Sequence, residues 1–439
     1  SPHLLHERLG DIYLEHLSNQ DDAWSHYAAF MAGADTSIDR ARAARKLASI
    51  HMLQGDLHEA RTHFETALAH LSDLPANPEA NRVRCGLAYL FVSQGDLQQA
   101  GIHVRQSVRM ARNIGDKRGL ADAYRIRGII ANHQGNPRLS LAYARRCLAL
   151  YQELMDLPQT VMATNNVADS CRQLGQLRAA RGYLRRGMTM AQRIGDTRDE
   201  ALLLVTLAET QLDLGRPLDA IASAQKGLPL AEASGALTRI IQTLRTLGLA
   251  FAALGKGEEA RRQLELALAK CNDSGHHRFT AEIHLDLAHL AAETGDFARA
   301  ESQLKLARQA NGTDSVPAIE RQVKRAEGFL ALRKQDWNDA VAWLEGSLAN
   351  NDPPESVTQR AQAYFLLGQA LTGRQASGDL ALAQGHLKAA TAAYRSVGAT
   401  SLVSVTQELL VEATRPKIRD NADESMLMHN GGYPDGERS

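Results

Sequence analysis

A glycine recurs at intervals of forty residues through most of this chain. The octet LQGDLHEA at 53–60 returns as SQGDLQQA at 93–100. The same position is held by Gly55, Gly95, Gly135, Gly175, Gly215, Gly255 and Gly295. Five residues after each of these glycines stands a small residue, such as Ala60 or Ala100. A fixed period of this length indicates a stack of similar structural units rather than one compact core.

The register continues beyond Gly295 with one substitution and one shift. Gln335 occupies the next glycine position, and the glycine returns three residues late as Gly378. Ahead of the array, LGDIY at 9–13 has the pattern of a degenerate first unit. The sequence therefore predicts about ten units.

Both sides of the recurring turn have helical periodicity. Before the glycine comes a pair of an apolar and a small residue, such as Leu47-Ala48. After it, Ala60 is followed by Phe64 and Ala67, a spacing that places all three on one face of a helix. Each unit is therefore expected to contain two antiparallel helices in close contact, which must stack on neighbouring units to bury their apolar faces.

This order of leucine, small residue, glycine, alanine, bulky residue and alanine resembles the tetratricopeptide repeat, over about residues 4–395. The sequence departs from that family in its period, which is forty residues rather than about 34. It also has His51 and Ala131 where the family usually has tyrosine. The resemblance implies an all-α fold: a right-handed superhelical solenoid of about ten helix-turn-helix repeats, closed by a C-terminal capping helix.

Forty-residue repeats with linkers such as NIGDKRGLADAY (113–124) are similar to those of bacterial STAND regulators, including the maltose-regulon activator and AfsR-type proteins. They are also similar to the repeats of kinesin light chains and of LGN polarity scaffolds. In the bacterial group, such arrays are sensor or partner-binding segments beside a nucleotide switch and an output domain. That resemblance, together with the start at Ser1-Pro2, leads us to expect an adjoining domain that this fragment lacks.

The expected organisation has four parts. Residues 1–36 form a divergent first unit, and residues 37–395 form the regular array. Residues 396–414 are expected to form a helix that covers the apolar face of the last repeat, as the end of a solenoid requires. Residues 415–439 have little periodicity and are predicted to be a flexible tail.

Composition argues against several functions. The chain has 439 residues, and its 50 basic residues balance 50 acidic ones, so no global field favours nucleic acid or an anionic membrane. No apolar run approaches the roughly 20 residues that span a bilayer, and no signal peptide opens the chain. The four cysteines are Cys85, Cys147, Cys171 and Cys271. Because they form no CxxC pair, we expect buried thiols in a reducing, cytoplasmic setting.

No segment has the spacing of a catalytic or cofactor site. The stretch GQALTGRQ at 368–375 has Arg374 and Gln375 where a phosphate-binding loop needs lysine and a hydroxyl. Four histidines cluster in sequence: His276, His277, His284 and His289. None of their separations gives the i, i+4 pair of a helical metal site. We therefore expect no enzyme activity, no metal and no cofactor.

The first helices of successive units are expected to line a concave groove, and those of the early units are basic. Their arginines are Arg42, Arg45, Arg82, Arg84, Arg125 and Arg127. Arginine forks suit carboxylates and phosphates, so these side chains are candidates for an anion-binding site. The alternative is that they are solvated arginines without a ligand.

The segment TNNVADSCRQLG at 164–175 is more specific. Asn165 and Asn166 precede Asp169 and Arg172, and asparagine lowers helix stability, so the adjacent pair indicates a role. An amide both donates and accepts hydrogen bonds, as a peptide backbone requires. The segment resembles the double-asparagine helix of kinesin-light-chain repeats, which implies that Asn165 and Asn166 hold a peptide with Arg125 and Arg172 beside it. The alternative is a hydrogen bond between helices of the solenoid.

These features lead us to expect a non-catalytic sensor or protein-interaction segment of a larger bacterial signalling or transcriptional regulator. Its groove would bind a peptide or protein partner, or a small ligand, and the bound state would favour one curvature of the array. The alternative is a free-standing scaffold that collects peptide motifs without an attached switch. An ATPase, DNA-binding or cyclase module in the full-length gene would distinguish the two.

Overall fold

The computed structural model describes residues 2–15, 19–274, 279–311, 317–349 and 356–414, and all the regular structure in these ranges is helical. In chain order the helices are α1 (Pro2–Glu15), α2 (Gln20–Ala32), α3 (Ser37–Gln54), α4 (Leu57–His70), α5 (Pro78–Ser93), α6 (Leu97–Ile114), α7 (Lys117–His133), α8 (Pro137–Glu153), α9 (Leu157–Gln173), α10 (Leu177–Ile194), α11 (Thr197–Asp213), α12 (Pro217–Ala233), α13 (Leu237–Ala253), α14 (Gly257–Ser274), α15 (Thr280–Glu293), α16 (Phe297–Asn311), α17 (Pro317–Lys334), α18 (Trp337–Leu348), α19 (Val357–Arg374), α20 (Asp379–Val397) and α21 (Thr400–Thr414).

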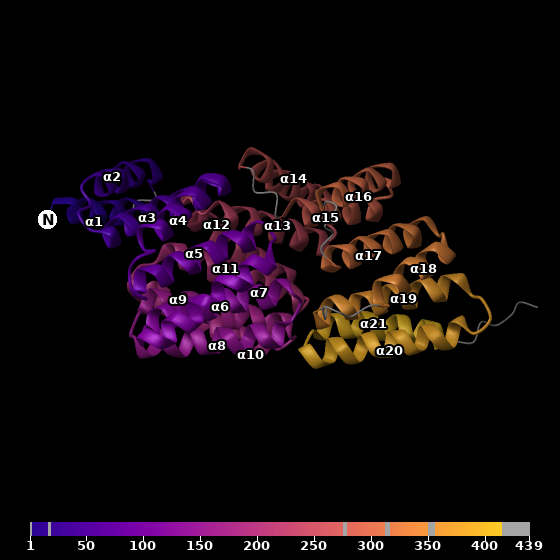
Figure 1. The fold of residues 1–439 in the computed structure, drawn as a ribbon. Coiled ribbons are helices and arrows are strands. Elements are labelled where there is room, and N and C mark those ends of the chain that lie inside the picture. The colour runs from indigo at the N-terminus through magenta and orange to yellow at the C-terminus, as the bar shows by residue number, and fades with distance from the viewer. Residues whose placement is uncertain (1, 16–18, 275–278, 312–316, 350–355, 415–439) are drawn as a thin grey trace, which may run out of the picture.

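The helices pack as ten consecutive pairs, α1 with α2 through α19 with α20, followed by the single helix α21 (Figure 1). The predicted all-α solenoid, its number of repeats and its final helix are therefore confirmed. The odd-numbered helices, which are the first helices of their units, also contact one another between neighbouring units. Examples are the pair α5 and α7 and the pair α9 and α11. We call the surface that these first helices form the first-helix face. The surface of the even-numbered, or second, helices is the second-helix face.

The recurring glycine ends the first helix of a unit. Gly55 has a φ of 83°, in the left-handed region that favours glycine, and its N–H donates to the carbonyl of His51. The side chain of Asp56 then accepts the N–H of Glu59 and caps α4. Gln335, which replaces the glycine, takes the same left-handed conformation, with a φ of 65°. The repeated octet is thus a turn between helices.

Small residues let the two helices of a unit approach closely. Gly248 on α13 faces Leu264 on α14, and a Cβ added to Gly248 would lie 2.6 Å from the side chain of Leu264. The pair Gly368 and Leu387 has the same arrangement in the last unit, also at 2.6 Å. Ala260 and Ala383 precede these leucines by one turn and are fully buried. The small and bulky positions in the sequence therefore interlock as predicted.

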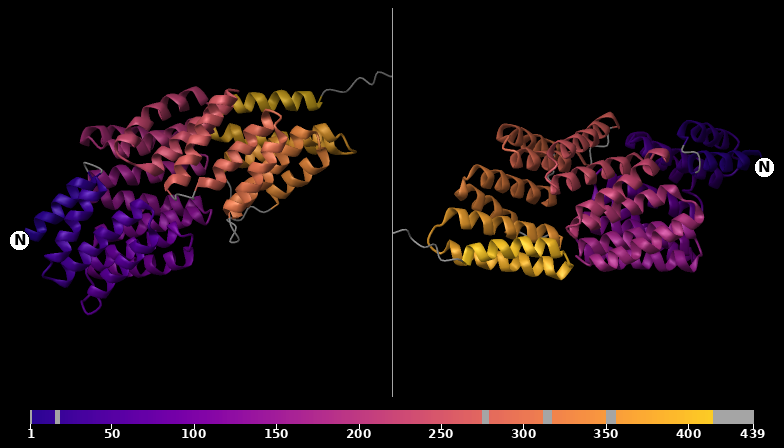
Figure 2. Two further views of the ribbon diagram at one scale, coloured as in Figure 1. Left: turned by 90° about the horizontal axis from the view of Figure 1, so that it is seen from above. Right: turned by 180° about the vertical axis from the view of Figure 1, so that it is seen from behind.

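The end of the array packs against its middle, where α19, α20 and α21 meet the turns that follow α9 and α11 (Figure 2). The buried residues of this contact are Leu177, Leu214, Ala361, Ala390, Tyr394, Val397 and Ala399. The Ser401 hydroxyl on α21 also donates to the carbonyl of Gly215, at 3.0 Å. We call this contact the closure. The helix α21 thus covers α20 and reaches the middle of the chain, whereas the predicted tail at 415–439 lies outside the described residues.

Candidate functional site

The predicted site residues lie on four first helices. Arg42 and Arg45 are on α3, Arg82 is on α5, and Arg125 is on α7. The four residues Asn165, Asn166, Asp169 and Arg172 are all on α9. Because equivalent residues are forty apart, Arg125 and Asn165 occupy the same position in neighbouring units.

Three of the early arginines, Arg42, Arg45 and Arg82, surround a buried carboxylate, Glu79, which is 3% exposed. The Nε of Arg45 lies 2.5 Å from Glu79 Oε1, and the Nη1 of Arg82 lies 3.1 Å from Oε2. The Nε of Arg42 is 3.9 Å from the same carboxylate, and Arg42 also pairs with Glu7 at 3.1 Å. Burial opposes ionisation of Glu79, but the guanidinium groups of Arg45 and Arg82 outweigh it and lower its pKa. An anion could therefore use these arginines only in competition with Glu79.

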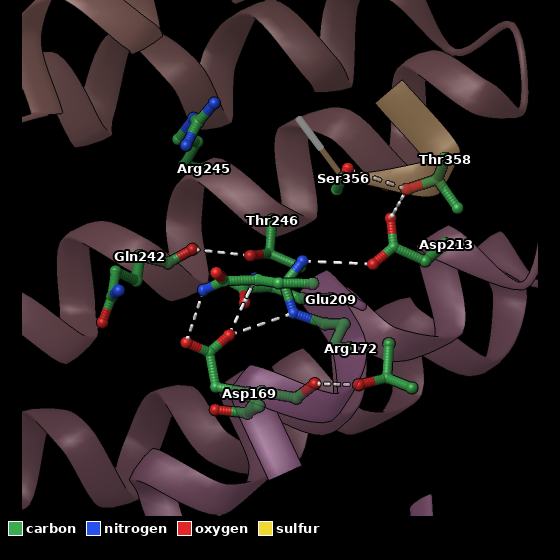
Figure 3. A network of polar contacts seen from close by, with 12 residues as sticks. Asp169, Arg172, Glu209, Asp213, Gln242, Arg245, Thr246, Ser356 and Thr358 are labelled. Atoms are coloured by element: carbon green, nitrogen blue, oxygen red, sulfur yellow. Dashed lines mark hydrogen bonds and ion pairs between the residues drawn. The ribbon is translucent and has the colours of Figure 1, made fainter. Parts of the chain in front are cut away.

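Asp169 and Arg172 belong to a larger polar network (Figure 3). The Nη2 of Arg172 lies 3.0 Å from Asp169 Oδ1 and 3.2 Å from Glu209 Oε2. Its Nη1 lies 3.1 Å from Oδ2 of Asp213. Although burial opposes it, the charges of Glu209, Asp169 and Asp213 raise the pKa of Arg172 above its ordinary value. One guanidinium group therefore joins three carboxylates on two neighbouring first helices.

The same arrangement recurs two units later. The Nε of Arg245 on α13 lies 2.5 Å from Asp286 Oδ2 on α15, and Arg245 also pairs with Glu282. Glu209 interacts electrostatically with both guanidinium groups, those of Arg172 and Arg245, and each acts to lower its pKa. Burial raises the pKa of Glu209, Asp213 and Asp286 in spite of their arginine neighbours. We call this set the acidic network: Asp169, Arg172, Glu209, Asp213, Arg245, Glu282 and Asp286.

The acidic network has five carboxylates and two guanidinium groups, so its members carry a formal excess of three negative charges. Partly buried carboxylates in excess of their cations stabilise any positive group that approaches them. This part of the first-helix face can therefore accept a cationic side chain or an amine.

Two polar atoms beside this network, on α7 and α9, lack a hydrogen-bond partner, as does Gln211 Oε1 on α11. Asn165 is 5% exposed, and its Oδ1 accepts no hydrogen bond. The Nε of Arg125, also buried, donates to no acceptor, while its guanidinium lies 5.9 Å from the centre of the Tyr89 ring. Buried polar groups are nearly always hydrogen-bonded, so each of these atoms needs a partner that the protein does not supply, either a water molecule or a ligand. Asn166 lies next to Asn165 and is partly exposed.

The cysteine thiols and the histidines of the described residues lie in environments that suit a structural role. Burial raises the pKa of the Cys85 and Cys147 thiols to about 12, which keeps them protonated at neutral pH. His284 hydrogen-bonds Gln303 at 2.6 Å, and His289 stacks on Phe329. No group of three potential metal ligands occurs among the residues that the structure describes, which leave out His276 and His277.

Sequence reasoning did not identify Glu209, Asp213 or Arg245, although the sequence contains a signal for them. Arg172 contacts the carboxylates 37 and 41 residues later, and Arg245 does the same. These separations are one repeat minus three and one repeat plus one. Because successive first helices lie side by side, a search for charge pairs at one repeat length would have found both arginines.

Comparison with known proteins agrees with this architecture. The tetratricopeptide repeat family matches residues 39–113, 119–193 and 159–233. A Rap protein complexed with competence and sporulation factor has a TM-score of 0.57 at 12% identity, covering 86% of this chain and 99% of that one. The apo form of RapI has a TM-score of 0.50 at 12% identity, covering 62% and 97%. These two similarities concern the fold alone.

A STAND protein with a tetratricopeptide repeat sensor from Pyrococcus horikoshii also resembles the chain. It has a TM-score of 0.47 at 16% identity, and the similarity covers 70% of this chain and 47% of that one. A score this low carries no functional argument. No curated protein matches the sequence.

Proposed function

We propose that the chain, a helical solenoid that matches the tetratricopeptide repeat family over residues 39–113, 119–193 and 159–233, binds a peptide or protein partner on its first-helix face, across α7, α9, α11 and α13. The observation that carries this proposal is the pair of orphaned polar atoms, Asn165 Oδ1 and Arg125 Nε, at equivalent positions of neighbouring units. Two unpaired groups at one repeat spacing suit a ligand that extends along the array.

The chemistry of these groups defines what the partner offers. Asn165 Oδ1 is an acceptor for a backbone N–H, and Arg125 is a donor for a carbonyl or carboxylate oxygen. The acidic network next to them suits a lysine, an arginine or a free amino terminus. The partner that fits this surface best is therefore a segment whose backbone bonds Asn165 and Arg125 and whose positively charged group reaches the acidic network about one repeat unit further along the array.

We assign the array to the sensor or interaction segment of a larger signalling or transcriptional regulator in the cytoplasm. Support comes from the similar Rap structure, which was determined with competence and sporulation factor bound. Asp213 belongs both to the acidic network and to the closure, so a cation that draws Asp213 away from Thr358 would alter how the chain's end is held. The full-length gene separates this role from a free-standing scaffold, which would lack a switch module.

A peptide library tests the binding site. A random peptide display library is panned against the protein, and the affinity of an enriched peptide is measured by fluorescence anisotropy. We expect Asn165→Ala with Arg125→Ala to weaken binding about tenfold or more, since each lost hydrogen bond is worth about 1 kcal/mol. The matched control is Gln225→Ala with Arg262→Ala, which removes an amide and a guanidinium from the second-helix face. Unchanged affinity in the first variant, at unchanged helical circular dichroism, would remove Asn165 and Arg125 from the site.

A further inference from the structure

Three consecutive second helices, α6, α8 and α10, have an unusual charge. Together they contain eleven arginines, no lysine and one acidic residue, Glu153, which gives a net charge of +10. The arginines are Arg105, Arg109, Arg112, Arg138, Arg145, Arg146, Arg178, Arg181, Arg185, Arg186 and Arg193. All eleven are exposed. We call this surface the arginine face; its helices run from violet to magenta in Figure 1.

The arginine face is confined to these three units. Arg105, Arg145 and Arg185 are one repeat apart and form a row across the helices. The equivalent position in the preceding unit is Glu65, and in the following unit it is Gln225. A neutral chain therefore carries a sharply bounded positive surface, which the overall charge balance conceals.

These arginines are not neutralised within the protein. Among the described residues, none of the eleven forms an ion pair with a carboxylate; the one acidic residue of these helices, Glu153, pairs with Lys117 instead, at 2.5 Å. Arg112 donates to the Tyr124 hydroxyl at 3.1 Å, and Arg146 lies 5.8 Å from the centre of the same ring. Their charge is therefore available to an external anion.

The surface favours a polyanion over a folded protein partner. Protein interfaces are anchored by apolar and aromatic side chains at their centre, with charged residues depleted there. Across α6, α8 and α10 the only exposed large apolar side chain is Leu139, at 40%. Tyr143 and Tyr183 are partly buried, so the face offers no open aromatic platform for the bases of a single strand.

We propose that the arginine face binds the phosphate backbone of double-stranded nucleic acid, without reading its sequence. Guanidinium forks match phosphate oxygens in bidentate geometry, and a set of several releases counterions from the duplex on binding. This activity is separate from the proposed partner binding, because it uses the second helices. The balanced charge of the whole chain led to the opposite expectation, that the protein does not bind nucleic acid. Binding depends instead on the local density of charge.

The test measures binding of a fluorescent 30-base-pair DNA duplex of random sequence to the full chain at 50 and 200 mM salt. We expect affinity that falls steeply with salt. The variant Arg105→Glu/Arg145→Glu/Arg185→Glu should bind at least tenfold more weakly. If it loses three phosphate contacts, its plot of log affinity against log salt should be shallower by about three. The control Arg216→Glu/Arg262→Glu/Arg395→Glu changes net charge equally at exposed sites elsewhere and should keep most of the affinity.

Competition identifies the kind of polyanion. Duplex DNA should be displaced by unlabelled duplex at lower phosphate concentration than by vesicles of phosphatidylserine, and poly-glutamate should compete weakly. Three results would each overturn the proposal: no duplex binding at 50 mM salt, an equal loss in both triple variants, or preferential binding of vesicles or poly-glutamate. Asn165→Ala with Arg125→Ala should leave duplex binding unchanged, which keeps the two proposals experimentally distinct.

Discussion

Asp213 and Thr358 are 145 residues apart in the chain, yet the Thr358 hydroxyl donates a hydrogen bond to Oδ1 of Asp213 at 3.3 Å (Figure 3). The other carboxylate oxygen, Oδ2, lies 3.1 Å from Arg172 in the acidic network. One side chain therefore joins the candidate binding surface to the closure. A change at either place alters the electrostatic environment of the other.

The closure can be opened without unfolding the helices. Val357 begins α19 and packs on Gly175 in the turn after α9. We expect Val357→Glu to open the closure, because it places a carboxylate near Asp213, while a negative charge at a helix N-terminus favours α19 itself. Small-angle X-ray scattering should show a larger radius of gyration with unchanged helical circular dichroism. Leu380→Glu, at an exposed position early in α20, is the control and should change neither. Equal radii for all three proteins would contradict the closure.

Removing one of the two cations of the acidic network should lower the stability of the fold. Arg172→Met leaves Asp169, Glu209 and Asp213 without their shared guanidinium, and we expect a loss of about 3 kcal/mol in urea denaturation. Adding Glu209→Gln and Asp213→Asn to this variant should restore part of the loss. The exposed Arg185→Met on α10 should stay within about 0.5 kcal/mol of the parent. A similar, small effect of both arginine substitutions would show that the network does not stabilise the fold.

The turn at Gln335 offers a stabilising substitution. Gln335 has a φ of 65°, so Gln335→Gly should relieve about 1 kcal/mol of backbone strain and raise the thermal midpoint. The matched change one repeat earlier is Gly295→Ala, at a φ of 82° with no atom within 4 Å of the added Cβ. It should lower the midpoint by a similar amount. The proposed cause is wrong if both substitutions shift the midpoint in the same direction.

Asp199 on α11 should make the stability of the fold depend on pH. Burial, together with the charge of Asp196, raises the pKa of Asp199 to about 6. The unfolded chain therefore releases this proton first, and stability is lost as the pH rises from the ordinary aspartate pKa of about 4 to about 6. We expect Asp199→Asn to stabilise the protein at pH 7.5, by at most about 3 kcal/mol, and to have little effect at pH 3.5. Asp219→Asn, at an exposed carboxylate on α12, is the control. Equal effects of Asp199→Asn at both pH values would rule out this titration.

The repeat architecture could be predicted because each unit is specified locally. Gly55 and Asp56 encode a turn, and Ala60 and Phe64 encode the packing of the next helix, whatever happens elsewhere in the chain. The closure could not be predicted in this way. The burial of Leu214 and Val397 in one cluster depends on how small rotations between successive units accumulate, and no pattern within one unit records that sum.

The binding role of the candidate site residues stays a prediction. The asparagine pair drew attention to α9 because two helix-disfavouring residues stand together there, and Asn165 does hold an unpaired oxygen. Two partners of Arg172 could not be predicted from the sequence of α9 alone, because Glu209 and Asp213 lie on the next first helix. The arginine face was overlooked since averaging over 439 residues cancels a charge of +10 on three helices.

Hydrogen exchange of the protein with and without a library-selected peptide tests the central claim most directly. Binding on the first-helix face predicts slower amide exchange in α7, α9 and α11, with unchanged exchange in α6, α8 and α10. Protection confined to the second helices would contradict the account, as would a library that yields no peptide dependent on Asn165 and Arg125.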